Sequence, residues 1–356
     1  MKLPRLSPLD ALLVCVPATL AARWIWPDRP VLSFASSCLA VVPLAGLMGR
    51  ATEALAARVG TAVGGFLSAT FGNAAELILG LAALRAGELA VVKASITGAI
   101  VGNLLLVFGA AAFAGGLRRE KQTFNATAAG AGVATLFLAS VALLVPALLH
   151  HGADPHPEKR VPFSVAISLV LLATYALSLR FSLGTHAHLY DVEVDEAAAG
   201  VSGPRWSVRR ALGVLVGATV AVAVMSEILV GSIEGAAHAL GLSRVFVGVV
   251  VVAIVGNAAE HSTAVLMALR DRMDLALHIA VESSKQVALL VAPALVLAGL
   301  ALGRPMDLVF TPLEVVAVGA ATGAITLVAL DGESNWLEGA MLVAVYAVLG
   351  VAFYFA

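Results

Sequence analysis

Long apolar runs separated by short polar breaks extend along the whole chain. Runs of about 20 apolar residues, the length that crosses the hydrocarbon core of a bilayer, lie at approximately 8–25, 30–48, 61–86, 88–115, 124–149, 162–183, 208–232, 243–269, 273–301, 308–330 and 335–356. The breaks between them are short clusters of charged residues, proline and glycine, which favour water or lipid headgroups. The pattern predicts an all-α polytopic membrane protein with about eleven transmembrane helices.

Two of these runs carry the same polar phrase. Gly-Asn-Ala-Ala-Glu occupies residues 72–76 and recurs at residues 256–260, 184 positions later. An ionisable side chain within a membrane span costs about 2.5–3.5 kcal/mol on insertion scales, so such a residue usually faces a cavity, an ion path or a partner. Two copies in two halves of the chain predict one site built from both.

When the first run is set aside, the longest connector divides the remaining ten runs into two sets of five. It covers residues 184–207 and contains four acidic residues, Asp191, Glu193, Asp195 and Glu196. Because five is odd, the second set must enter the membrane in the opposite orientation, as in the inverted repeats of secondary transporters. The predicted organisation is an N-terminal transmembrane helix (1–29), a first five-helix repeat (30–183), an acidic cytoplasmic connector (184–207) and a second five-helix repeat (208–356). A solvated loop is the simplest interpretation of the acidic cluster, with regulation as the alternative.

Other polar residues correspond between the halves. Thr52-Glu53 precedes the first phrase and Ser226-Glu227 precedes the second, while Asn103 lies 27 residues after Glu76 and Gln286 lies 26 residues after Glu260. Within each phrase the amide and the carboxylate are three residues apart, so Asn73 and Glu76, like Asn257 and Glu260, project from one helical face. We therefore expect the polar groups of both halves to meet near the bilayer midplane.

Composition and charge narrow the class of protein. Hydrophobic residues make up 60% of the chain, charged residues 13%, and the mean hydropathy is +0.96, which excludes a soluble globule. The lipid bilayer is the expected surrounding, and a net charge of −1 gives no reason to expect nucleic acid as a partner. The two cysteines, Cys15 and Cys38, lie in separate apolar runs and predict neither a disulfide framework nor a thiolate metal site.

The candidate ligands are all oxygen atoms. Carboxylates of Glu76 and Glu260, amides of Asn73, Asn257, Asn103 and Gln286, and hydroxyls of Ser283 and Ser284 suit a hard cation such as calcium, which takes six to eight oxygens. Without a cation, two carboxylates in a low dielectric tend to take up protons, because desolvation and mutual repulsion oppose ionisation. His261 could tune or relay a proton. These residues predict exchange of a cation for protons, with no cofactor.

The balance of basic residues predicts the orientation. A cytoplasmic N-terminus places thirteen Lys and Arg in cytoplasmic breaks and seven in the opposite ones, which favours the N-terminus inside and the C-terminus outside. The first run could instead be a signal peptide, although Arg23-Trp24-Ile25-Trp26 is more typical of an interfacial helix end. A prokaryotic plasma membrane is the expected location, and a homo-oligomer remains open.

The phrases resemble those of the calcium/proton antiporters of the CAX type, within the calcium:cation antiporter superfamily. The resemblance rests on the two Gly-Asn-Ala-Ala-Glu phrases, the histidine after the second one, Thr52-Glu53, Ser226-Glu227 and residues 181–186, Phe-Ser-Leu-Gly-Thr-His. It implies eleven spans, inverted five-helix repeats and export of cytosolic calcium by alternating access. It also implies that Glu76 and Glu260 carry calcium and protons, that His261 is proton-linked, and that Glu53 and Glu227 are auxiliary acids along the cation route.

One departure from the family pattern leaves the ion open. Residues 282–286 read Glu-Ser-Ser-Lys-Gln, where the family leads us to expect Gly-Ser-Ser and a small polar residue before the glutamine. Glu282 and Lys285 could neutralise each other, or Lys285 could act as a tethered cation, and sodium or potassium exchange for protons is then an alternative.

The asparagines could serve as interhelical hydrogen-bond partners. An intramembrane enzyme and a channel are more distant alternatives, because the duplicated site favours a transporter and neither a hydrolase motif nor a zinc motif occurs.

Overall fold

The computed structural model describes residues 8–59, 61–150, 156–187 and 206–356. Its first half contains α1 (Pro8–Ala11), η1 (Leu12–Val14), α2 (Cys15–Ile25), α3 (Pro30–Ala56), α4 (Thr61–Phe71), α5 (Ala74–Ala86), α6 (Leu89–Val101), η2 (Gly102–Val107), α7 (Phe108–Gly116), β1 (Gln122–Thr123), α8 (Ala126–His150), η3 (Pro157–Lys159), α9 (Arg160–Arg180) and η4 (Phe181–Thr185). Its second half contains α11 (Val208–Leu240), α12 (Arg244–Phe246), η6 (Val247–Val252), α13 (Ala253–Gly256), α14 (Ala258–Leu269), α15 (Met273–Gln286), η7 (Val287–Val291), α16 (Ala292–Ala301), α17 (Pro312–Ala329), β2 (Glu333–Ser334) and α18 (Trp336–Phe355).

The expected all-α membrane architecture is confirmed. Within the described residues, eight continuous helices are long and apolar enough to cross a bilayer, and a ninth span arises if the bent pair Arg244–Gly256 and Ala258–Leu269 is counted as one. The first expected run appears as a shorter apolar helix, Leu12–Ile25. The number eleven stays a prediction.

Two of the expected spans are broken where the repeated phrase occurs. The run expected at 61–86 is divided into α4 and α5, and the run expected at 243–269 bends by 61° between α13 and α14. Asn73 and Asn257 stand at the breaks, each as the residue before the next helix, with backbone angles outside the helical region. The phrase therefore begins a helix in the interior of the protein.

Two helices are longer than their apolar runs. The apolar runs ended at about 48 and 232, but α3 continues to Ala56 and α11 continues to Leu240, where Gly241 adopts a left-handed φ of 65°. Alanine- and leucine-rich turns past the apolar run keep the helices going, because no helix breaker intervenes. Glu53 and Glu227 consequently lie on helices, and Glu227 is well inside α11, not near its end.

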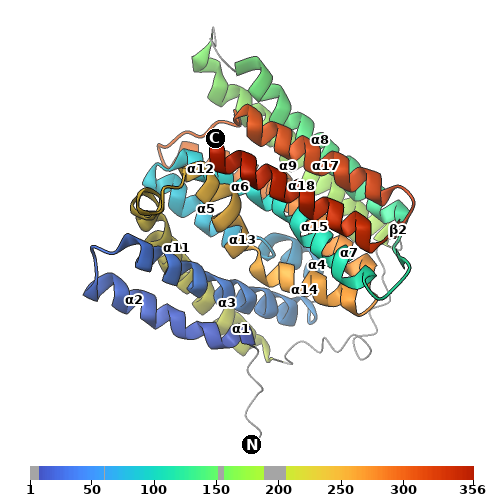
Figure 1. Ribbon diagram of the computed structural model, residues 1–356, viewed down its shortest axis with the longest axis horizontal. Coiled ribbons are helices and arrows are strands. Elements are labelled where there is room, and N and C mark those ends of the chain that lie inside the picture. Colours follow the sequence, from blue (N-terminus) through green and yellow to red (C-terminus); the bar gives the residue numbers. More distant parts are fainter. Residues whose placement is uncertain (1–7, 60, 151–155, 188–205) are drawn as a thin grey trace, which may run out of the picture.

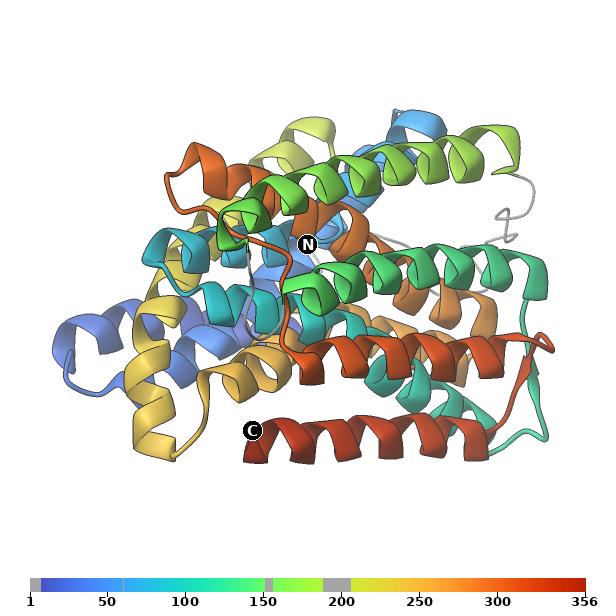
Figure 2. The ribbon, with the colours of Figure 1, turned by 90° about the horizontal axis from the view of Figure 1, so that it is seen from above.

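The helices form two outer groups around a buried centre. Figure 1 shows α2, α3 and α11 together on one side and α8, α17 and α18 on the opposite side, with α5, α6, α13, α14 and α15 between them. Figure 2 shows α8, α17 and α18 running roughly parallel along one edge. The central span Leu89–Gly116 has 83% of its most apolar window buried by protein, whereas α18 has 22%. The outer helices are therefore less buried by protein than the central ones, which carry the polar residues.

The backbones of the two halves approach each other closely where α6 crosses η6. A Cβ atom added to Gly98 would lie 2.1 Å from the carbonyl oxygen of Val249, and one added to Gly248 would lie 2.6 Å from Ala94 Cβ. Such small residues let two backbones approach each other inside a membrane protein. The crossing holds α6, which leads to Asn103, against η6, which leads to Asn257.

Polar contacts fasten the loops at one end of the bundle. Gln122 and Thr123 of β1 pair antiparallel with Ser334 and Glu333 of β2. The Gln122 side chain donates to the carbonyl oxygen of Ala268 at 2.9 Å, so the same loop also grips the end of α14. These contacts join loops of both halves.

Candidate functional site

The structure brings both glutamates to the start of interior helices. Glu76 lies in the first turn of α5 and Glu260 in the first turn of α14, each directly after an interior break. Unpaired backbone N–H groups give a helix N-terminus a partial positive charge, which favours carboxylates there. The two side chains are close enough to influence each other electrostatically. Residues 184 positions apart thus face one site.

Amide and hydroxyl groups of both halves form a hydrogen-bonded chain. Asn73 Nδ2 donates to Gln286 Oε1 at 2.6 Å, and the Ser283 hydroxyl donates to Asn73 Oδ1 at 3.1 Å. Asn103 Nδ2 donates to the Ser283 hydroxyl at 2.8 Å. The predicted meeting of Asn73, Asn103, Ser283 and Gln286 is present in the structure, with Ser283 as the group that joins the two asparagines.

Three other oxygen atoms of the candidate site have no hydrogen-bond partner. Among the described residues, Glu76 Oε2, Glu260 Oε2 and Asn257 Oδ1 are buried and have no hydrogen-bond partner. Buried polar atoms without partners are costly, and a native protein keeps them for a reason such as a bound ion. Three oxygens of this kind, two of them on carboxylates, match the ligands that a hard cation prefers.

The glycine of each phrase leaves room for a group from the other half. A Cβ at Gly72 would lie 3.2 Å from Gln286 Oε1, and a Cβ at Gly256 would lie 3.6 Å from Glu76 Oε1. The Asn257 amide nitrogen donates to the carbonyl oxygen of Ala253 at 3.0 Å, which leaves its oxygen free. The two phrases are therefore related in sequence but differ in their contacts.

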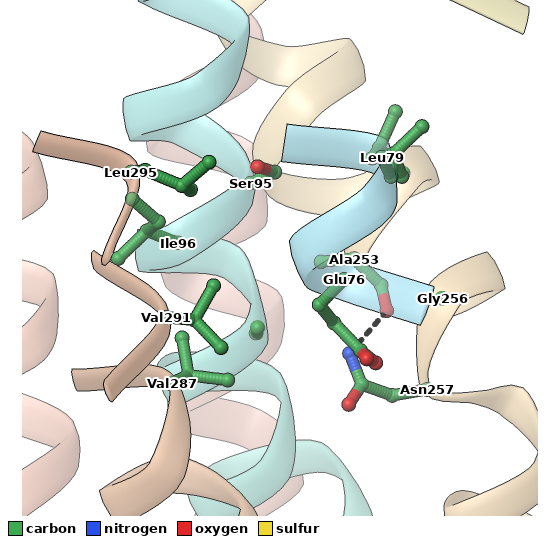
Figure 3. Close-up of a pocket in the computed structure, with 12 residues that line it drawn as sticks. Glu76, Leu79, Ser95, Ile96, Ala253, Gly256, Asn257, Val287, Val291 and Leu295 are labelled. Carbon is green, nitrogen blue, oxygen red and sulfur yellow. Dashed lines mark hydrogen bonds between the residues drawn. The ribbon is translucent and has the colours of Figure 1, made fainter. Parts of the chain in front are cut away.

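A narrow cavity adjoins the glutamate of the first phrase. Figure 3 shows the Glu76 carboxylate next to the Asn257 carboxamide, with apolar side chains across the cavity. Its lining is mostly aliphatic, and Ser95 of α6 is one of its few polar members; the residues are Glu76, Leu79, Ser95, Ile96, Ala99, Val252, Ala253, Gly256, Asn257, Val287, Val291 and Leu295. The cavity is thus lined by side chains of both halves, with Glu76 and Asn257 side by side in its wall.

Replacing Ser283 tests the hydrogen-bonded chain. Ser283→Ala would leave a buried oxygen of Asn73 and a buried amide of Asn103 without their partner, which costs about 1–3 kcal/mol. We expect a lower thermal midpoint of the purified protein in detergent, measured by tryptophan fluorescence. Ser284→Ala is the matched control, because the Ser284 hydroxyl donates to the carbonyl oxygen of Ala280 in its own helix. Equal midpoints for the two variants would contradict this account of Ser283.

Not every predicted site residue lies in the cluster. Ser284 is buried but turned onto its own helix backbone. Glu53 is exposed on α3, and Glu227 pairs with Arg85 at 3.2 Å on the outer surface. His261 is partly buried, and its Nε2 has no hydrogen-bond partner among the described residues. The functional roles of these residues stay predictions.

Other charged residues are not members of the hydrogen-bonded chain. Glu282 and Lys285 form an ion pair of 2.7 Å within α15. The acidic residues Asp191, Glu193, Asp195 and Glu196 of the connector lie outside the described residues. The sequence pattern predicts no partner for Lys93. Its amino group contacts Asp307 and donates to the carbonyl oxygen of Val309 at 2.8 Å. A charge inside an apolar run was the signal that could have identified this contact, which fastens α6 to the loop before α17.

Fold and site together define a multi-pass membrane protein of the ion-exchanger class. The chain matches the sodium/calcium exchanger protein family over residues 29–184 and 210–355. It belongs to this family.

Relatives resemble the chain over nearly its whole length. It is 47% identical over 364 residues to a protein of Synechocystis named Ca2+/H+ antiporter, covering 97% of this chain and 96% of that protein. A protein of Aphanothece halophytica with the same name is 44% identical, covering 97% and 95%. The solved structure of native YfkE superimposes with a TM-score of 0.85 at 36% identity, covering 98% of this chain and 100% of that one. A structure named H+/Ca2+ exchanger CAX, at 16% identity, shares the fold with a TM-score of 0.72 over 98% of this chain and 91% of that one.

Proposed function

We propose that this protein exchanges calcium for protons across a membrane, with Glu76 and Glu260 as the groups that carry both ions. The observation that carries the proposal is the set of buried, unpaired oxygens on Glu76, Glu260 and Asn257, contributed by two halves of the chain. Relatives named as Ca2+/H+ antiporters at 47% and 44% identity support calcium as the ion. Calcium and protons are substrates here, and no cofactor is required.

The two carboxylates explain why the ions compete. A divalent cation offsets two negative charges at once, so the site is stable with both carboxylates ionised around calcium. When the cation leaves, two carboxylates facing each other in a low dielectric are stabilised by taking up protons. Each ion therefore displaces the other. Asn73 and Gln286 hold each other by a hydrogen bond beside this site, and Ser283 fixes their position relative to Asn103.

Transport at the proposed site requires no covalent bond to be made or broken. The family to which the chain belongs consists of ion exchangers, which move ions without making or breaking covalent bonds. The site consists of carboxylates, amides and hydroxyls that bind an ion reversibly. The protein is accordingly proposed to be a transporter and not an enzyme.

The proposed arrangement in the cell follows from the charge balance and the duplication. The N-terminus lies in the cytoplasm and the C-terminus outside, in a prokaryotic plasma membrane, because thirteen basic residues fall on one side and seven on the other. Residues 30–183 and 208–356 form inverted repeats preceded by a helix at 1–29 and joined by the connector 184–207. The family match to 29–184 and 210–355 supports this division. Lipid surrounds the outer helices, and copies of the chain could associate through them.

The decisive experiment measures proton movement in vesicles. Protein reconstituted with a pH gradient is challenged in turn with calcium, sodium and potassium, and the gradient is followed with a pH-sensitive dye. We expect calcium to collapse the gradient and the two monovalent ions to leave it intact. Collapse by sodium or potassium alone would replace calcium as the proposed substrate, and a gradient that no cation collapses would overturn exchange.

A further inference from the structure

An ion pair lies beside the hydrogen-bonded chain on the same helix. Lys285 Nζ donates to Glu282 Oε1 at 2.7 Å, and the exposed fractions of the two side chains are 3% and 23%. Both residues belong to α15, which also carries Ser283 and Gln286. In the part of the chain that the structure describes, Glu282 is the carboxylate paired with Lys285. A nearly fully buried cation thus stands next to a proposed cation site.

Two other ionisable side chains of the described residues interact with Glu282, and neither is a carboxylate. They are Tyr175 of α9 and His278, one helical turn before Glu282. A tyrosine is neutral at ordinary pH and a histidine is neutral or positive. Compensation of the Lys285 charge therefore depends on Glu282.

Helix geometry places the pair within electrostatic reach of the site. Successive residues of an α-helix are about 100° apart, so Glu282 lies about 40° from Gln286 and Lys285 lies about 100° from it. Glu282 is thus positioned between the lysine and the amide. Lys285 directly precedes Gln286, and Glu282 directly precedes Ser283, so both charges lie on the turn of α15 that contributes to the site. An uncompensated charge close to an ion inside a protein acts strongly on it, and twice as strongly in free energy on a divalent ion as on a monovalent one.

We propose that Glu282 is a specificity-determining residue that cancels the field of Lys285 at the site, so that a divalent cation binds there. The inference rests on the proposed exchange of calcium for protons. If Glu282 cancels the charge of Lys285, the departure from the family pattern at residues 282–285 leaves the electric field at the site unchanged. The proposal also assigns opposite effects to the two members of the pair, since removing the carboxylate exposes the site to a positive charge and removing the amine exposes it to a negative one.

The test compares single and double neutral variants. The half-saturating calcium concentration for proton movement is measured for the wild type, Glu282→Gln, Lys285→Met and the double variant. We expect at least a roughly tenfold increase for Glu282→Gln, a decrease of about threefold for Lys285→Met, and a value within about threefold of the wild type for the double variant. Maximal rates are expected to stay within about twofold of the wild type, since the pair touches no transported ion.

A second readout does not depend on transport. Calcium that binds the folded protein raises its thermal midpoint, and the concentration dependence of that shift reports affinity. The calcium dependence of the midpoint is expected to follow the same order, with Lys285→Met tightest and Glu282→Gln weakest. Lys121→Met and Glu333→Gln serve as the control pair, because that ion pair of 2.6 Å is exposed and lies in the loops. We expect neither control to change half-saturation.

The opposite signs of the two single variants separate the charge effect at the site from a structural one. A purely structural ion pair would weaken calcium binding in both single variants, because each leaves a buried charge unpaired, and this result would overturn the proposal. Unchanged half-saturation in Glu282→Gln would overturn it as well. If Glu282→Gln does not accumulate in the membrane, the Lys285→Met variant tests the proposal alone. A half-saturating calcium concentration equal to or above that of the wild type in this variant would then overturn it. A wild type and control pair without calcium-driven proton movement would overturn the proposed function and this inference with it.

Discussion

Glu76→Gln is expected to abolish calcium-driven proton movement. The substitution keeps the shape of the side chain but removes one of two facing carboxylates, together with the group that takes up a proton. A carboxylate and a bound calcium ion form a buried pair of opposite charges, and truncating one partner of such a pair costs about 2–5 kcal/mol, which corresponds to a roughly 30-fold or greater loss of calcium affinity. Because glutamine cannot be protonated in this range, the residual exchange should not exceed that of empty vesicles. Glu260→Gln is expected to have the same effect, since it removes the corresponding carboxylate of the other half.

The measurement is dye-reported proton movement in vesicles that contain equal amounts of protein. Glu158→Gln is the matched control, because the same chemical change is made at an exposed residue of the loop before α9. Size-exclusion profiles of the purified variants establish that they fold. A wild-type rate in either Glu76→Gln or Glu260→Gln would remove that residue from the proposed site.

Gly98→Ala is expected to destabilise the whole protein. Its added methyl group would lie 2.1 Å from the carbonyl oxygen of Val249 and 2.7 Å from Val249 Cα, so it meets backbone that cannot rotate away. Overpacking of this kind costs about 1–3 kcal/mol, and more where backbone must move. We expect a fall of the thermal midpoint by about 5 °C or more, on the scale at which such free energies shift melting of folded domains, and a reduced yield in membranes.

Gly102→Ala provides an unusually close comparison. Gly102 lies one turn further along the same span, and a Cβ added there has no atom within 4 Å. Alanine favours a helix over glycine, so this variant is expected to melt at the wild-type temperature or slightly above it. Equal midpoints for Gly98→Ala and Gly102→Ala would mean that the crossing of α6 and η6 tolerates a side chain.

The sequence was sufficient for the polar cluster but not for its detailed contacts. A repeated phrase in apolar surroundings predicted that Asn73, Asn103, Ser283 and Gln286 would meet, and the structure joins all four. The sequence did not predict that the Ser284 hydroxyl would donate to a carbonyl oxygen of its own helix. Neighbouring serines differ only by their rotation about the helix axis, and the phase of that rotation depends on how the helix packs.

Helix irregularities limited what periodicity could show. Asn103 lies in the π-helical segment η2, and η7 begins directly after Gln286. A π-turn contains an extra residue, which shifts all later side chains around the axis, and such turns are frequent at functional sites. No pattern of period 3.6 indicates where the extra residue enters. The breaks at Asn73 and Asn257 did not divide the predicted spans either, because apolar residues continue on both sides of each phrase.

Helix ends were also misplaced for a definable reason. The extents of α3 and α11 were underestimated because the apolar runs end before the helices do. Alanine, leucine and glutamate sustain a helix beyond the hydrocarbon region, and polarity alone does not end it. Glu227 was therefore expected near a span end, whereas it lies within α11 and pairs with Arg85.

The pairing of distant halves has a consequence for biosynthesis. Asn73 bonds to a residue 213 positions later, and Asn103 to one 180 positions later. At about 5–20 residues per second, a ribosome needs roughly 10–40 s to reach those partners. During that interval the first half has entered the membrane with its buried amides unpaired and with Gly98 facing no backbone. The newly made first half therefore lacks part of its interior contacts, and these contacts form only after residues 247–286 have been made.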